Sequence, residues 1–153
     1  MGKLFAPFLL SISAVLLLSL PCLADAAKEK AFVDTYKKAF EAKDETTLKS
    51  LLYTKGADPE ILEFYTMMMT GEMGSKISSI ELRDLTPDEV KKASEMQPLP
   101  SGEMAKLPFT PTKKLVLKVD ASDAGGTGTS TSQSFVGLID GKYMIPVPGP
   151  AKK

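Results

Sequence analysis

The chain has 153 residues, with 19 basic and 19 acidic side chains, a single cysteine and no histidine. The absence of histidine excludes Ser-His-Asp triads, histidine general bases and histidine-rich zinc sites. Arginine occurs once, at Arg83, and the formal charge is balanced. A nucleic-acid binder concentrates basic side chains and uses arginine forks, so this partner class is disfavoured.

The first 26 residues have the layout of a secretory signal peptide. Lys3 gives a basic start, an apolar run follows from about Phe8 to Leu20, and the small residues Ala24 and Ala26 form the exit. This run is shorter than the roughly 20 residues that span a bilayer, which disfavours a membrane anchor. We therefore expect an exported protein, periplasmic or secreted, that meets the membrane only through its leader.

Cys22, the only cysteine, lies inside this leader. Cleavage would leave a mature chain without disulfides, thiolate nucleophiles or cysteine metal ligands, which suits a bacterial periplasm. A lipid anchor through Cys22 is a disfavoured alternative, because Pro21 stands where lipidation requires a small residue. The remaining chain suits one domain with one core, expected at 27–148, followed by a flexible tail at 149–153.

Helical patterns fill the first half of the mature chain. Apolar residues recur at helical spacing from Lys28 to about Ala42, which predicts an amphipathic helix. Asp44 is placed to cap a second, shorter helix. The inward-facing residues of this second helix are expected to be Leu48, Leu51 and Leu52.

Capping residues predict the starts of two further helices. Asp58 followed by Pro59 predicts a third helix over 59–70, which Gly71 ends. The sequence Thr86-Pro87-Asp88-Glu89 matches a capping box and predicts a short helix that extends to about Met96.

The period changes to two in the strands. We predict strands over 76–85, 112–122 and 131–148, with an edge strand at 103–107. Asp140-Gly141 predicts a two-residue turn that pairs Leu138 with Tyr143. The low-complexity run at 121–134 is expected to form a mobile hairpin loop. Two sets of residues should share the apolar face of the sheet: Val136, Leu138, Tyr143, Ile145 and Val147, and Leu115, Leu117 and Val119, with only Val116 breaking the polar side.

Together these elements predict an α+β fold, in which N-terminal helices pack on a curved, mainly antiparallel sheet. The opening FVDTYKKAFEAKDETTLKSLLY and the closing GLIDGKYMIPV resemble the nuclear-transport-factor-two-like superfamily, which includes ketosteroid isomerases and scytalone dehydratase. The resemblance covers Phe32 to Val147 and includes no catalytic motif. It implies a cone-shaped, cystatin-like or ketosteroid-isomerase-like fold with a cavity between the helices and the concave face of the sheet.

Five residues are candidate ligand-binding residues of this cavity: Tyr36, Tyr65, Met68, Met69 and Tyr143. All fall on faces assigned inward, where tyrosine hydroxyls need hydrogen-bond partners and methionines adapt to irregular shapes. Packing in the core is the simpler account of each. A Cu(I) site in MMMTGEM is a weaker alternative, and no metal or cofactor is expected.

The sequence leaves three classes of function open. The leading one is a non-catalytic binding or accessory protein of the bacterial cell envelope, which holds a small apolar ligand or a partner's surface between helices and sheet. A second is a small lyase, isomerase or hydrolase that uses a tyrosine and a buried carboxylate, with candidates Asp34, Glu41, Glu63 and Glu72. The third is a structural domain that forms a homodimer through its open sheet.

Overall fold

The protein was analysed as a computed structural model, which describes residues 21–98, 102–123 and 126–151. Its helices are α1 (Pro21–Glu41), α2 (Glu45–Lys49), α3 (Pro59–Thr70) and α4 (Pro87–Ser94). Its strands are β1 (Leu52–Tyr53), β2 (Lys76–Asp84), β3 (Gln97–Pro98), β4 (Met104–Lys106), β5 (Lys113–Asp123), β6 (Gly126–Ile139), β7 (Lys142–Pro146) and β8 (Gly149–Pro150).

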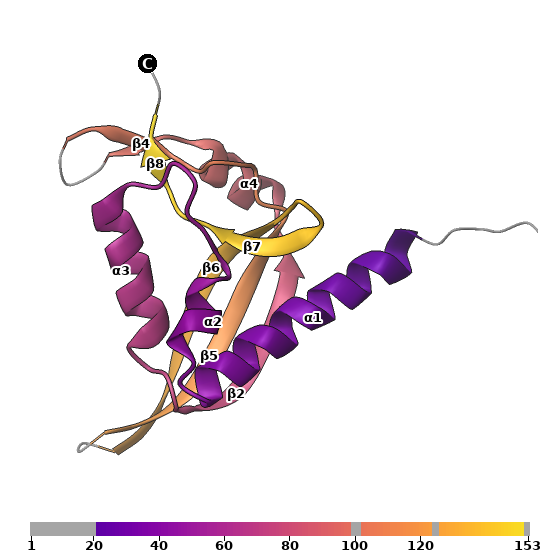
Figure 1. Ribbon diagram of the computed structural model, residues 1–153, viewed down its shortest axis with the longest axis vertical. Coiled ribbons are helices and arrows are strands. Elements are labelled where there is room, and N and C mark those ends of the chain that lie inside the picture. Colours follow the sequence, from indigo (N-terminus) through magenta and orange to yellow (C-terminus); the bar gives the residue numbers. More distant parts are fainter. Residues whose placement is uncertain (1–20, 99–101, 124–125, 152–153) are drawn as a thin grey trace, which may run out of the picture.

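The strands form a five-stranded sheet in the order β1-β7-β6-β5-β2 and a small sheet in the order β3-β4-β8. All neighbours pair antiparallel except β1 and β7, which are parallel. In Figure 1, α1 crosses the large sheet, α3 stands beside it, and α4 lies near the small sheet. The predicted α+β class, with N-terminal helices packed on a mainly antiparallel sheet, is confirmed.

Two neighbouring lysines show that α1 and α4 lie on opposite faces of the large sheet. The Lys113 Nζ lies 2.9 Å from the Glu29 carboxylate of α1. The Lys114 Nζ lies 2.5 Å from the Glu89 carboxylate of α4. Successive side chains of a strand point to opposite faces. We refer to these surfaces as the α1 face and the α4 face.

The α1 face carries the main core. Leu115, Leu117 and Val119 of β5 are at most 4% exposed, as their alternation with polar residues predicts. They pack with aromatic residues of α1 and with Leu48 of α2. The full cluster is Phe32, Tyr36, Ala39, Phe40, Leu48, Leu52, Met69, Ile77, Leu115, Leu117, Val119, Val136, Tyr143, Ile145 and Val147.

The helix starts form as predicted. The Asp44 carboxylate accepts a hydrogen bond from the Thr47 amide at 3.0 Å, and the Asp58 carboxylate accepts one from the Glu60 amide at 3.0 Å. Both halves of the capping box of α4 are present, since Thr86 and Glu89 each bond the other's backbone amide. These contacts satisfy amide groups that the first turn of a helix leaves without partners.

The hairpin of β6 and β7 also forms in the predicted register. Asp140 and Gly141 have φ values of 49° and 77°, which a two-residue turn of this hand requires. Leu138 pairs with Tyr143, and Val136 on the same face is fully buried. Leu138 itself is 40% exposed, which corrects its predicted burial, because it lies beside the turn at the outer end of the hairpin.

Three segments differ from the expectation. Leu52, assigned to the second helix, instead lies in β1 and pairs with Ile145. The run expected as a loop instead continues the β5–β6 ladder as far as the pair Asp123 and Gly126. The tail expected to fray is ordered through Ala151, whose amide donates to the Met104 carbonyl at 2.8 Å.

The start of the chain lies partly beyond the described residues. Residues 1–20 of the predicted leader are outside them, as are Lys152 and Lys153. Residues 21–26, the rest of the predicted leader, form the first turns of α1, which begins earlier than its periodicity indicates. None of the helices in the described ranges has the length and apolar character needed to cross a membrane.

Candidate functional site

The α1 face, where the cavity was predicted, is filled by packed aromatic side chains. Tyr36 stacks on Phe40 with ring centroids 6.1 Å apart, and Phe32 lies 6.4 Å from both Tyr36 and Tyr143. Tyr36 is 4% exposed, and burial, aided by the charge of Glu72, raises the pKa of its hydroxyl to about 12. The structure therefore brings Tyr36 and Tyr143 together as members of the core.

The two methionines among the candidate ligand-binding residues lie on different sides of α3. Met69 is buried in the core, whereas Met68 is 54% exposed, so the inward assignment of Met68 is wrong. Consecutive residues of a helix point about 100° apart, so the three methionines of 67–69 cannot share one face. Met67 is also exposed, at 61%.

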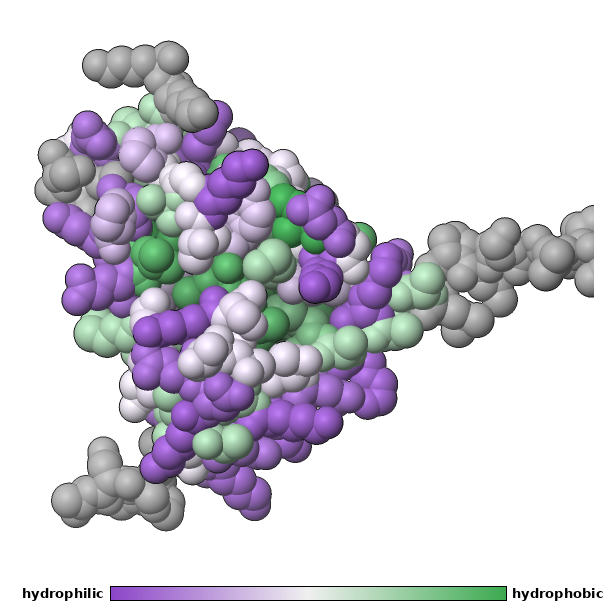
Figure 2. Space-filling view, viewed as in Figure 1, coloured by the Kyte–Doolittle hydropathy of each residue, from purple (hydrophilic) through white to green (hydrophobic). Residues whose placement is uncertain are grey.

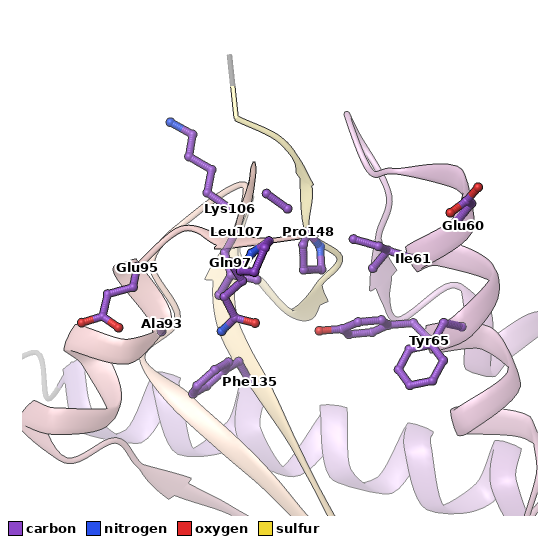
Figure 3. A pocket seen from close by; sticks show the side chains of 13 residues that line it. Glu60, Ile61, Tyr65, Ala93, Glu95, Gln97, Lys106, Leu107, Phe135 and Pro148 are labelled. Carbon is purple, nitrogen blue, oxygen red and sulfur yellow. The ribbon is translucent and has the colours of Figure 1, made fainter. Parts of the chain in front are cut away.

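Tyr65 lies elsewhere, in a groove of about 510 Å³ on the side of the molecule that carries α4 (Figure 3). The groove is bounded by α3, by the end of α4, by the small sheet and by one residue of the large sheet. The lining residues are Glu60, Ile61, Phe64, Tyr65, Ala93, Glu95, Gln97, Pro98, Ala105, Lys106, Leu107, Phe135 and Pro148.

The first two turns of α3 form one wall. Ile61 and Tyr65 are four residues apart, so both point to the same side of the helix, and Figure 3 shows the Tyr65 hydroxyl reaching toward the middle of the groove. The Asp58 amide donates to the Pro148 carbonyl at 3.0 Å. This bond ties the start of α3 to the segment that leads into β8, so the wall is held at its upper end.

The opposite wall comes from α4 and the small sheet. Ala93, near the end of α4, and Ala105, in β4, are both buried. Gln97 of β3 pairs with Ala105, and Ala105 pairs with Pro150 of β8. The small side chains at these positions leave room for the groove, and the backbone pairs fix its outline.

Phe135 of β6 forms the floor. It pairs with Lys114, so it lies on the α4 face. Farther along β6, Phe109 packs against Gly137, where an added Cβ would come within 2.5 Å of the Phe109 ring. Tyr53 also contacts the Phe109 ring in an edge-to-face arrangement, with centroids 5.3 Å apart. The absence of a side chain at Gly137 therefore lets an aromatic ring cover the sheet next to the groove.

The charges of the groove lie at its rim. Glu60, Glu95 and Lys106 are exposed, and no charged side chain is buried among the residues that the structure describes. Burial raises the pKa of the Tyr65 hydroxyl, so it stays protonated at neutral pH and can both donate and accept a hydrogen bond. The Gln97 amide is the other uncharged polar side chain of the lining. This arrangement suits an apolar body that carries one or two polar atoms.

The candidate carboxylates do not gather with a tyrosine in this groove. Asp34 is paired with Lys30 at 2.5 Å, which lowers the pKa of the carboxyl group. Glu41 and Glu63 are exposed. Within the described ranges, no group of three or more cysteine, aspartate or glutamate side chains is arranged to hold a metal ion.

Most of the lining residues were not predicted from the sequence, although two residues indicated that the α4 face is also covered. Val116 and Phe135 interrupt the polar side of their strands, and both lie on the α4 face. Val116 is 5% exposed, which shows that this face is also covered. Apolar residues on both sides of a strand indicate a sheet with two covered faces.

Comparison of the chain with protein-family models, with curated proteins and with solved structures finds no significant match. The fold and the geometry of the groove are therefore the basis for assigning a function.

Proposed function

We propose that this chain is a non-catalytic binding protein of the bacterial cell envelope, which holds a small apolar ligand in the groove between α3, α4 and the small sheet. The groove itself carries the proposal. Its volume of about 510 Å³ is within the range of small-molecule sites, roughly 300–1,000 Å³. Its lining is mainly aliphatic and aromatic, which favours an apolar ligand.

Tyr65 and Gln97 are assigned the role of orienting the ligand. The Tyr65 hydroxyl is partly buried, so an unmatched ligand would leave it without a hydrogen bond, whereas the exposed Gln97 amide would meet the ligand at the opening of the groove. The rim carboxylates Glu60 and Glu95 face solvent, so they would contact a ligand only at its exposed end. A ligand with an apolar body and one hydroxyl or carbonyl group fits this distribution.

The proposal includes two wider assignments. The order of the helices and the closing hairpin support placing the chain in the nuclear-transport-factor-two-like superfamily. The signal-peptide layout of residues 1–26 supports export to the periplasm or beyond. The mass of the mature chain recovered from the periplasm of its host would test export, with a start at Asp25 or Ala27 expected and a full-length cytosolic chain contradicting it.

Binding is tested by titration with N-phenyl-1-naphthylamine, a neutral apolar dye that fluoresces when it leaves water. Gln97 is exposed at the groove, so Gln97→Trp places a large ring in the opening without disturbing the main core. Met96→Trp is the matched control, since Met96 is the exposed neighbour outside the lining.

We expect saturable dye binding to the wild type and to Met96→Trp, and at least about tenfold weaker binding to Gln97→Trp, a difference of about 1.4 kcal/mol. Absence of saturable binding, or equal affinity of the two variants, would refute a ligand site in the groove.

A further inference from the structure

The outer side of α3 is apolar although it faces solvent. Met69, on the inner side of the helix, is buried in the core. On the outer side, Phe64 is 51% exposed, Met67 61% and Met68 54%. A helix on the surface of a protein normally turns polar residues outward. In Figure 2, green hydrophobic side chains reach the surface over α3, with purple hydrophilic side chains beside them.

The charged residues of the segment that contains α3 all have one sign. Residues 56–75 contain the acidic residues Asp58, Glu60, Glu63 and Glu72 and no lysine or arginine, although the whole chain is neutral. Other helices carry carboxylates that pair with lysines, as Asp34 of α1 does with Lys30 and Glu89 of α4 does with Lys114. Among the residues that the structure describes, Glu60 and Glu63 make no such ion pair.

These residues form a continuous strip along the helix. Residues three and four apart are neighbours on a helix surface, which places Glu60, Phe64 and Met67 or Met68 in one row. Glu63 lies beside that row. We call Glu60, Glu63, Phe64, Met67 and Met68 the outer strip of α3.

The side chains of the outer strip indicate what kind of partner it would bind. Methionine is flexible and is common on surfaces that accept helices of varied sequence, and aromatic residues act as anchors in interfaces. An apolar row lined by carboxylates is complementary to a helix with one apolar side flanked by lysine or arginine. We propose that the outer strip of α3 is a docking site for a basic amphipathic helical segment of a partner protein.

This site is separate from the groove for most of its length. Glu63, Met67 and Met68 do not line the groove, whereas Glu60 and Phe64 belong to both. Substitutions at Met67 and Met68 therefore test docking without altering the proposed ligand site, so failure of one proposal is distinguishable from failure of the other.

The test uses a leucine–lysine amphipathic peptide of about 18 residues, five turns of helix, labelled with a fluorophore. Anisotropy is measured with the wild type, with the double variant Met67→Ser/Met68→Ser and with Met96→Ser. Met96 is a matched control because it is 55% exposed and lies outside the outer strip. A scrambled peptide of the same composition separates helix docking from simple charge attraction.

We expect saturable binding to the wild type and to Met96→Ser, at least tenfold weaker binding to the double variant, and binding to Glu60→Gln/Glu63→Gln that depends less on salt. Equal binding of the scrambled peptide would overturn the proposal. So would a wild type that is already a dimer and becomes a monomer in the double variant, because a second copy would then cover the strip. Binding to anionic lipid vesicles in preference to the peptide would overturn it as well.

Discussion

The two faces of the large sheet are covered in different ways. On the α1 face, aromatic rings of one long helix pack against aliphatic strand residues, and Phe40 and Val136 are almost completely buried. On the α4 face, separate pieces cover the sheet: Phe109 over Gly137, α4 over Lys114, and a groove above Phe135. A long amphipathic helix closes a face, whereas short elements joined by turns leave space between them.

The groove lies on the face with the weaker pattern of apolar and polar residues. Strong alternation of apolar and polar residues identified the α1 face as the buried one, and the family resemblance implied a cavity there. Strong alternation instead marks a face that the protein fills completely. The groove lies where single apolar residues, Val116 and Phe135, interrupt an otherwise polar side.

The largest expected effect is a difference in stability between two variants, each of which removes one phenylalanine from one face. Phe40→Ala should lower the free energy of unfolding by about 3–5 kcal/mol, because it leaves a cavity in a closed core. Phe135→Ala should cost under about 2 kcal/mol, since its half-buried ring already faces open space. Urea denaturation measures both values. Similar losses for the two variants would remove the distinction between the faces.

A smaller effect tests how the α4 face is covered. Gly137→Ala should lower the free energy of unfolding by about 1–3 kcal/mol, because its Cβ would meet the Phe109 ring at 2.5 Å. Gly128→Ala, also in β6, is the control, since a Cβ there meets nothing within 4 Å. Adding Phe109→Leu to Gly137→Ala should recover part of the loss. No recovery would mean that Phe109 does not cover this position.

Removal of a tyrosine hydroxyl should weaken ligand binding on the α4 face but not on the α1 face. Tyr65→Phe should weaken binding of a hydroxyl-bearing apolar ligand by about two- to tenfold, the value of one neutral hydrogen bond. Tyr36→Phe should leave that affinity unchanged, because Tyr36 lies in the closed core. Isothermal titration calorimetry checks both variants. Loss of affinity in Tyr36→Phe alone would move the site back to the α1 face.

The smallest expected effect is on the loss of stability at acidic pH. The bond to Lys114, aided by the Thr86 amide, lowers the pKa of Glu89 from 4.5 to about 2. A carboxyl group whose folded pKa is depressed stabilises the protein above its unfolded pKa, and this contribution is lost as the pH falls from about 4.5 toward 2. Glu89→Gln should therefore flatten the decline of the urea midpoint over that range. An unchanged decline would show that the Glu89–Lys114 pair does not hold α4 in solution.

Much of the fold was predictable because its signals are local. Asp58-Pro59 and the capping box at Thr86 fix where helices begin, and Asp140-Gly141 fixes the register of a hairpin. β1 was missed because Leu52 is placed by Ile145, far along the chain. No local pattern of two residues encodes such a parallel pair.

The groove was harder to predict than the fold because its lining comes from many separate segments. Tyr65 was identified from its place on α3, but Ala93 and Ala105 contribute by being small, and Pro148 by its position after β7. Such residues have no chemical signature in a sequence. Phe135, an apolar residue on an otherwise polar side of its strand, did carry such a signature.

The proposed ligand site lies on the α4 face, whereas the α1 face is closed. The most direct measurement is a titration of the isotopically labelled protein with N-phenyl-1-naphthylamine, followed by two-dimensional NMR of the backbone amides. We expect shifts that saturate at the amides of Tyr65, Ala93, Gln97 and Phe135, with the amides of Tyr36 and Tyr143 unchanged. Saturating shifts centred on Tyr36 and Tyr143 would contradict it.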